Sequence, residues 1–309
     1  MKIIYAGTPD FAVPTLERLY NENYNIQLVI TQKDRRRGRG KKKQYTPVKQ
    51  KAKELDLEVF QPEDINNEES IEKLKDLNPD IMIVAAFGQI FKKEVLEIPK
   101  YGCVNLHASL LPKYRGAAPI NWAIIKGEKE TGITLMDMEE GLDTGDIIRK
   151  QSITIEKDDD SQSIHDKLSI LGSDLLIETI EDIVKVTVKR VPQDEDLSTY
   201  APMLFRDTGK IDWNQSAEDI FNLIRGLKPW PGAYTNYKDE VVKIHKASIS
   251  SRIKNGEPGE IVKVDNSGIY VNALDDTIVI EELQFPNKRK MKTKDYLAGN
   301  SIELNTILG

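Results

Sequence analysis

The chain reads IMIVAAFGQIFKKEVLEIPKYGCVNLH at residues 81–107, where two apolar runs, 81–87 and 102–107, have the length and composition of buried β-strands. Similar runs precede them and alternate with helical patterns, at residues 2–7, 26–31 and 57–60. Such alternation is typical of a mostly parallel sheet with helices on both faces. We therefore expect a Rossmann-like α/β fold in the first half of the chain.

A different pattern begins near residue 189, where the polar, proline-containing stretch VPQDEDLSTYAP has the composition of a linker. Four closely spaced strand-like runs follow it, separated by Gly, Asn and Asp, at residues 241–249, 259–264, 268–274 and 277–285. We therefore expect an α/β domain at residues 1–188, a linker at 189–207 and a small, OB-like β-barrel at 208–309.

Composition excludes several classes of protein. Hydrophobic residues make up 39% of the chain and charged residues 30%, which is typical of a folded globular protein. One cysteine, Cys103, and three histidines provide neither a disulfide framework nor a metal-ligand cluster, so no metal is expected. The longest apolar run, 81–87, is far shorter than the ~18 residues of a membrane span, and the N-terminal run is shorter than a signal peptide requires. We expect a cytoplasmic protein without a membrane partner.

Positive charge is concentrated in one segment. The net charge is −6, but residues 33–53 contain eleven basic residues and one acidic residue, an excess of +10 that leaves −16 on the rest of the chain. A smaller basic patch, NKRKMKTK, lies at residues 287–294. Dense like charge is typical of a solvated surface and also of a polyanion site, and composition alone leaves both interpretations open.

Three polar residues are candidates for catalysis. Asn105 and His107 stand two positions apart at the end of the run 102–107, so on an extended strand their side chains point to the same face. Asp143 lies in the loop EEGLDTGD, after the next strand-like run, from which it can reach the same volume. Ligands of open α/β sheets bind beyond the carboxyl ends of the strands, which favours this location. The alternative is a group of purely structural polar residues.

Signatures of other chemistries are incomplete. The glycines of AGTPDF lack the G-x-G-x-x-G spacing of a dinucleotide site, and GRGKK lacks the spacing of a phosphate-binding loop. No G-x-S-x-G nucleophile motif occurs. His165 and His245 lie in a helical and a strand-like pattern without a nucleophilic partner nearby, and both are interpreted as structural.

The segment SLLPKYRGAAPINWAI (residues 109–124) follows the candidate strand directly. Exposed leucines in a loop are unfavourable in water, so the segment is expected to line an apolar pocket. The alternative is that Leu110 and Leu111 pack under the sheet.

Several motifs together resemble the methionyl-tRNA formyltransferase family along the whole chain. They are AGTPDFAVP, GRGKK, NLHASLLPKYRGAAPI, MDMEEGLDTGD and IRGLKPWPGAYT. The element N-x-H-x-SLLP with a later Asp is shared by folate-dependent formyltransferases in general. The glycinamide ribonucleotide formyltransferases are similar at Asn105, His107 and Asp143, but typically have a phosphate-binding loop where this chain has GTPDF, and no barrel.

The resemblance implies a formyltransferase fold and transfer of the formyl group of 10-formyltetrahydrofolate to the α-amino group of methionyl initiator tRNA. It implies that Asn105, His107 and Asp143 are catalytic. Folate-binding residues implied by the family motifs are Phe87, Gly88, Gln89, Ile90, Ser109, Leu110, Leu111 and Pro112. Implied tRNA-binding residues are Arg35, Arg36, Arg37, Arg39, Lys41, Lys42 and Lys43, with Arg39 matching the arginine that enters the acceptor stem. The barrel would bind tRNA, and a monomer is expected.

One departure and two alternatives accompany this resemblance. In DRRRGRG, many family members have a proline after the first arginine, so the charge of the loop is better defined than its conformation. A folate-dependent formyltransferase acting on a sugar nucleotide or other small amine would share the three catalytic residues but would not need the basic loop. A non-catalytic RNA-binding protein on the same fold would not need Asn105, His107 and Asp143.

Overall fold

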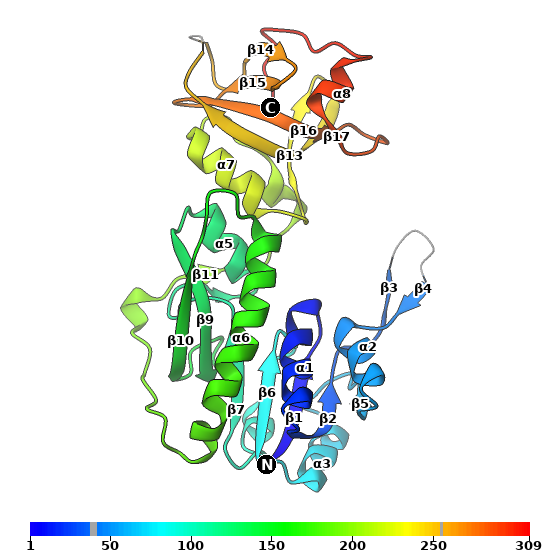
Figure 1. Cartoon of the computed structure of the whole chain (residues 1–309), viewed down its shortest axis with the longest axis vertical. Coiled ribbons are helices and arrows are strands. Elements are labelled where there is room, and N and C mark those ends of the chain that lie inside the picture. Colours follow the sequence, from blue (N-terminus) through cyan, green and yellow to red (C-terminus); the bar gives the residue numbers. More distant parts are fainter. Residues whose placement is uncertain (38–41, 254–255) are drawn as a thin grey trace. The chain divides into compact units, whose positions relative to one another are not determined.

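The computed structural model describes residues 1–37, 42–253 and 256–309, which form two compact units (Figure 1). The first unit consists of Met1–Ala117, Thr131–Ile153 and His165–Ala201. The second consists of Ala118–Glu130, Thr154–Ile164 and Pro202–Gly309. Each unit is built around a sheet with its own hydrophobic core.

A seven-stranded sheet with the order β10-β9-β7-β6-β1-β2-β5 forms the centre of the first unit. Its strands are β1 (Lys2–Gly7), β2 (Asn25–Ile30), β5 (Val59–Phe60), β6 (Ile81–Ala85), β7 (Cys103–His107), β9 (Glu130–Asp137) and β10 (Ile147–Thr154). Neighbours from β7 to β5 are parallel, whereas β9 is antiparallel to β7. The expected mostly parallel α/β sheet is confirmed.

Both faces of this sheet are covered by helices. On one face, Ile4 and Met82 belong to a core cluster that includes Leu74 of α3 (Glu68–Leu77) and Val95 of α4 (Lys93–Leu96). The other face is covered by α6 (Ser161–Val184), where Gly172 lies close to side chains of β7 and β9. Because strand residues alternate between faces, every position from Ile3 to Ala6 in β1 is buried.

The remaining short elements of this unit follow local signals in the sequence. A 3-10 turn, η1 (Asp10–Ala12), leads into α1 (Val13–Asn21), whose proline lies in the first turn as expected. The helix α2 (Pro47–Glu54) begins after Thr46, whose hydroxyl accepts a hydrogen bond from the backbone N–H of Lys49. Two small strand pairs complete the unit: β3 (Arg35–Arg37) with β4 (Lys42–Gln44), and β8 (Arg115–Gly116) with β11 (Tyr200–Ala201).

An antiparallel sheet with the order β12-β13-β16-β15-β14 forms the second unit, and β17 pairs with β16. The strands are β12 (Ala233–Tyr237), β13 (Glu240–Ser250), β14 (Ile261–Asp265), β15 (Gly268–Asn272), β16 (Thr277–Gln284) and β17 (Met291–Lys292). The helices of this unit are α5 (Pro119–Ile125), α7 (Ala217–Gly226) and α8 (Thr293–Leu297), and a short 3-10 turn lies at η3 (Arg206–Gly209). The remaining 3-10 turn, η2 (Glu195–Leu197), belongs to the first unit.

The C-terminal residues connect the two ends of this strand order. The backbone N–H of Leu308 donates to the carbonyl of Gly259 beside β14, and the N–H of Gly309 donates to the carbonyl of Asn236 in β12. The side chain of Leu308 is buried in the core of the unit. These bonds close the sheet into the expected small barrel.

The two units do not follow the expected succession of segments 1–188, 189–207 and 208–309. Helix α5 groups with α7 because Asn121 donates a 2.7 Å hydrogen bond to the carbonyl of Gly226. Arg225 likewise donates 3.1 Å hydrogen bonds to the carbonyls of Glu156 and Asp159. Most of the expected linker, up to Ala201, groups with the first unit. As functional domains, the three segments stay a prediction.

Truncating the buried side chain of Leu308 should destabilise the second unit. We expect Leu308→Ala to lower the free energy of unfolding by about 2 to 5 kcal/mol, the usual cost of a cavity left by a buried leucine. Leu304, which is 53% exposed, is the matched control, and Leu304→Ala should change stability by less than about 0.5 kcal/mol. Urea unfolding followed by circular dichroism measures both, and equal effects would contradict this role of Leu308.

Candidate active site

The end of β7 brings the three candidate catalytic side chains together. Asn105 and His107 share one face of the strand, and the carboxylate of Asp143 lies between them. Its Oδ1 accepts a hydrogen bond of 3.5 Å from Asn105 Nδ2, and its Oδ2 lies 3.5 Å from His107 Nδ1. His107 is buried, with 5% of its surface exposed. The carboxamide, the imidazole and the carboxylate therefore occupy one small volume.

Asp143 reaches this volume by a return path along β7. Because β9 is antiparallel to β7, Asp137 at the carboxyl end of β9 pairs with Val104, near the start of β7. The following loop must fold back before Asp143 can approach His107. The backbone of Asp143 adopts a left-handed conformation with φ 55°. The Oδ2 atom of Asp143 accepts a 2.9 Å hydrogen bond from the N–H of Gly116.

Both ring nitrogens of His107 face oxygen atoms. While Nδ1 faces Asp143, Nε2 lies 2.9 Å from the carbonyl oxygen of Tyr114. Tyr114 is itself held in place, because its N–H donates a 2.8 Å hydrogen bond to the hydroxyl of Thr199. The plane of the imidazole is thus fixed from two sides.

The segment after β7 is anchored to β9. Ser109 donates to the carbonyl of Lys113 at 2.7 Å, and its own carbonyl accepts from Thr134 at 2.7 Å. Leu111 is fully buried and forms a small cluster with Met136 and Ile147. Pro112 follows and accepts a hydrogen bond from the N–H of Thr199. Leu111 therefore packs against β9 and β10, and its role in folate binding stays a prediction.

Leu110 is partly exposed and lies beside Gly132 of β9. A Cβ atom on Gly132 would come within 2.5 Å of the Leu110 side chain and 2.2 Å of the carbonyl of Gln151. The absence of a side chain at Gly132 therefore makes room for Leu110.

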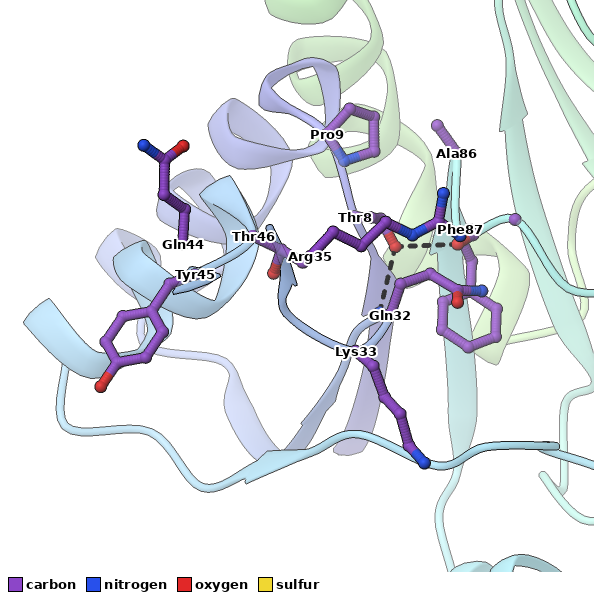
Figure 2. A pocket seen from close by; sticks show the side chains of 11 residues that line it. Thr8, Pro9, Gln32, Lys33, Arg35, Gln44, Tyr45, Thr46, Ala86 and Phe87 are labelled. Carbon is purple, nitrogen blue, oxygen red and sulfur yellow. Dashed lines mark hydrogen bonds between the residues drawn. The ribbon is translucent and has the colours of Figure 1, made fainter. Parts of the chain in front are cut away.

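A pocket of about 220 Å³ lies at the carboxyl ends of β1, β2 and β6 (Figure 2). The hydroxyl of Thr8 organises its floor, because it donates to the carbonyl of Phe87 at 2.8 Å and accepts from the N–H of Gln32 at 3.3 Å. The lining residues are Thr8, Pro9, Gln32, Lys33, Arg35, Gln44, Tyr45, Thr46, Ala86, Phe87 and Gly88. The pocket joins part of the loop after β6 with the first residue of the basic hairpin.

The two remaining folate candidates in the loop after β6 have different surroundings. Gln89 accepts a hydrogen bond from the N–H of Ile65 and donates to the carbonyl of Glu63, so its amide is used within the protein. Ile90 is 74% exposed, and Leu142, beside Asp143, is 52% exposed. Two loops of this region thus present large apolar side chains to solvent.

The basic segment is described in part. Arg35 is exposed, and the backbones of Arg36, Arg37, Lys42 and Lys43 form the hairpin of β3 and β4, whereas Arg39 and Lys41 lie outside the described residues. The base of the hairpin is anchored by Asp34, the single acidic residue of the segment. Its carboxylate accepts hydrogen bonds from Lys49 at 2.7 Å and from Gln61 at 2.8 Å, and its side chain is 6% exposed.

Other reactive groups are engaged in structure. Burial raises the pKa of the Cys103 thiol to about 12, so it is a poor nucleophile at neutral pH. His165 packs edge-on against Phe11, and His245 lies 3.1 Å from the amide oxygen of Gln284. Over residues 1–37, 42–253 and 256–309, no cluster of three acidic, His or Cys side chains is arranged to hold a metal ion. Within the same ranges, no helix has the length and apolar character needed to cross a membrane.

Sequence reasoning missed the residues that hold the loops of the candidate site. Arg115 is buried and donates to Gln193 and to the carboxylate of Glu195. Hydrogen bonding between the two ions raises the pKa of Arg115 and lowers that of Glu195. Gln193, Glu195 and Thr199 belong to the stretch expected to be a linker, where no periodic pattern marks them. Thr8 had a usable signal, since it is a polar residue directly after an apolar strand.

Comparison with known proteins identifies relatives over the full chain. Residues 1–180 match the Formyl transferase family model, and residues 203–301 match Formyl transferase, C-terminal domain. The methionyl-tRNA formyltransferase of Clostridium acetobutylicum is 52% identical over 100% of this chain and 99% of its own length. That of Clostridium perfringens strain 13 is 50% identical over the whole of both chains.

Solved structures are similar at lower identity. The sugar 3N-formyl transferase WlaRD, crystallised with dTDP and 5-N-formyl-THF, has a TM-score of 0.69 and 21% identity over 94% of this chain and 99% of its own. HypX from Aquifex aeolicus in complex with tetrahydrofolic acid has a TM-score of 0.62 and 18% identity over 99% of this chain and 50% of its own. At these identities, the likeness shows the shared fold.

Proposed function

The chain belongs to the methionyl-tRNA formyltransferase family, and on that premise we propose that it transfers the formyl group of 10-formyltetrahydrofolate to the α-amino group of methionyl initiator tRNA. The observation that carries the proposal is the position of Asp143, whose two carboxylate oxygens face Asn105 and His107. The three groups provide the hydrogen-bond donors and the carboxylate that formyl transfer between two nitrogen atoms requires. The product is N-formylmethionyl-tRNA for translation initiation.

In this reaction, the α-amino nitrogen attacks the formyl carbon and forms a tetrahedral intermediate with an anionic oxygen. We assign stabilisation of that oxygen to Asn105 Nδ2 and His107 Nε2, because preorganised donors are most effective where charge develops. His107 Nδ1 faces Asp143, so Nε2 is the nitrogen assigned to the substrate, and it keeps the orientation set by its contact with the Tyr114 carbonyl. The bond from the formyl carbon to N10 of folate then breaks.

Proton movement completes the transfer. The attacking amine loses one proton, and the departing N10 of tetrahydrofolate gains one, so the overall reaction is balanced without a metal or a redox partner. Asp143 orients the imidazole, because its carboxylate faces both Asn105 and His107. We assign to the same carboxylate the transfer of the amine proton, through a water molecule.

A folate-derived formyl donor fits the chemistry of the loops after β6 and β9. Ile90 and Leu142 present apolar surface suited to a flat ring system. The hydroxyl of Thr144, next to Asp143, is buried and has no hydrogen-bond partner among the described residues. On family grounds, we assign the pterin to the loop Phe87 to Ile90 and further folate contacts to Ser109, Leu110, Leu111 and Pro112.

For tRNA, we propose the basic segment as the principal contact, through Arg35, Arg36, Arg37, Arg39, Lys41, Lys42 and Lys43. Its excess of +10 opposes the −16 of the rest of the chain, so a polyanion is attracted to this segment specifically. The base of the hairpin borders the pocket of Figure 2 through Arg35. The second unit, with the patch at 287–294, is proposed to contribute further phosphate contacts. We also propose that the reaction takes place in the cytoplasm.

The rival function is formylation of a sugar nucleotide or another small amine. Its support is the similarity in fold to WlaRD, a sugar formyltransferase. The basic segment argues against it, since a small amine would gain little from eleven cationic residues.

The decisive experiment incubates the purified chain with 10-formyltetrahydrofolate and either charged initiator tRNA or a dTDP-linked amino sugar. We expect formylmethionine, detected by mass spectrometry after the ester is hydrolysed, from the tRNA reaction alone. Formylation of the amino sugar with none of the tRNA would establish the rival function. Tight tRNA binding without any formyl transfer would leave the non-catalytic RNA-binding alternative.

His107 should be essential for turnover. We expect His107→Ala to reduce kcat by at least about 100-fold, because one preorganised donor to the oxyanion is lost. The melting temperature should remain within a few degrees of the wild type. His165→Gln removes an imidazole elsewhere in the same unit and should retain normal turnover. A His107→Ala protein with near-normal kcat would assign this residue a structural role.

The basic segment should determine the salt dependence of tRNA binding. Each phosphate contact contributes ~0.7 to 0.9 to the slope of log K against log salt, so neutralising Lys41, Lys42 and Lys43 together should flatten the slope by up to about 2 to 3. Neutralising Lys288, Lys292 and Lys294 tests the second unit in parallel. The measurement is tRNA affinity at several salt concentrations. A larger change from the second triple variant would move the principal contact to the barrel.

A substitution at Asp34 tests whether tRNA binding depends on the geometry of the hairpin or on its charge alone. Asp34→Asn adds one positive charge to the segment but weakens the anchor to Lys49 and Gln61. We expect KM for tRNA to rise about five-fold, equivalent to roughly 1 kcal/mol of lost hydrogen bonding. Glu54→Gln makes the same charge change on the exposed face of α2 and should not raise KM. If Asp34→Asn tightened tRNA binding instead, charge alone would explain the role of the segment.

A further inference from the structure

We propose that Gln193 is a positioning residue for the catalytic carboxylate, because its side-chain amide donates hydrogen bonds to the backbone carbonyls of Asp143 and Gly145. The proposal rests on the proposed function, since it assigns Gln193 an effect on formyl transfer through Asp143. Gln193 lies in the connecting segment, defined as residues 191–201, which has the composition of a linker. The structure instead places this segment against the catalytic loops.

The side-chain amide of Gln193 makes four hydrogen bonds, two through its nitrogen and two through its oxygen. Its Nε2 donates to the carbonyl oxygens of Asp143 and Gly145, both at 2.8 Å. Its Oε1 accepts from Nε and Nη2 of Arg115, at 3.1 and 2.9 Å. One side chain therefore joins the loop that carries Asp143 to the loop that carries Gly116.

Those two loops meet again at the carboxylate itself. The N–H of Gly116, directly after Arg115, donates to Asp143 Oδ2 at 2.9 Å. Gln193 thus fixes the backbone of Asp143 while Gly116 fixes its side chain, and both anchors depend on the position of Arg115. The left-handed backbone of Asp143, with φ 55°, is unfavourable for a side-chain-bearing residue and needs such support.

The rest of the connecting segment keeps Gln193 in place. Val191 pairs with Ile147 at the start of β10, and Glu195 forms two hydrogen bonds with Arg115, at 2.8 and 2.7 Å. Further along, Thr199 holds Tyr114, and the N–H of Ala117 donates to the carbonyl of Ala201. A segment anchored at both ends can transmit a fixed geometry to the amide of Gln193.

Substitutions at Gln193 distinguish its two sets of bonds. Gln193→Ala removes both, whereas Gln193→Glu keeps an acceptor for Arg115 but loses the donor to the two carbonyls. We expect both variants to lower kcat by up to about 100-fold, as small displacements of catalytic groups do, with KM for tRNA and the melting temperature nearly unchanged. Asp196→Ala, at an exposed position of the same segment, is the matched control and should retain wild-type kcat.

A double-mutant cycle tests whether Gln193 acts through Asp143. If it does, Gln193→Ala should cause no further loss of kcat in an Asp143→Asn background, because the group being positioned is already changed. Losses that multiply in the double variant would overturn the proposal. So would a wild-type kcat in Gln193→Glu, which would assign the effect to Arg115 alone.

A measurement independent of activity separates this proposal from the proposed function. Amide hydrogen exchange, followed by mass spectrometry, should become faster in the peptide covering residues 139–147 in Gln193→Ala and remain unchanged in Asp196→Ala. If the wild-type chain formylates nothing but this exchange difference is present, the proposed function fails and the positioning of the loop stands. Unchanged exchange in Gln193→Ala would overturn the positioning role whatever the activity.

Discussion

The antiparallel pairing of β9 with β7 is the constraint on which the site depends. It places the carboxyl end of β9 beside Val104, at the far end of β7 from His107. The loop after β9 must therefore return along β7 to bring Asp143 to the imidazole. A loop on such a path has no strand neighbour of its own, so other segments must supply its hydrogen bonds. Gly116 and Gln193 do so, which explains why an apparent linker lies against the candidate active site.

Backbone conformation shows the cost of this arrangement. Non-glycine residues with left-handed φ follow three successive strands of the sheet: Ala86 after β6, Tyr114 after β7 and Asp143 after β9. Each such residue costs on the order of 1 to 3 kcal/mol unless its surroundings hold it. Tyr114 is held through both its N–H and its carbonyl. Gly145 meets a related demand, since a Cβ atom there would lie 2.0 Å from the carbonyl of Asp137.

What the sequence predicted, and what it did not, follows from the range of each interaction. The two-residue period of a strand was enough to place Asn105 and His107 on one face, and alternating apolar runs were enough for the mostly parallel sheet. The contacts of Gln193 with Asp143 join residues 50 positions apart and leave no periodic trace. Neither polar composition nor proline content distinguishes a mobile linker from a segment whose hydrogen bonds are made with distant loops. The grouping of α5 with α7 was missed for the same reason.

Charges close to the basic segment affect a ligand there more than the net charge of the chain does. At physiological salt, the Debye length is about 8 Å, so the −16 spread over the rest of the chain is largely screened at the basic segment. A polyanion approaching residues 33–53 therefore meets mainly their excess of +10, which is reduced by the ion pairs of Lys33 with Glu63 and of Lys51 with Glu17 and Glu54. Within that excess, Asp34 is nearly buried, where its charge orients Lys49 and Gln61 rather than repelling a ligand. The one acidic residue of the segment thus supports the hairpin that presents the cations.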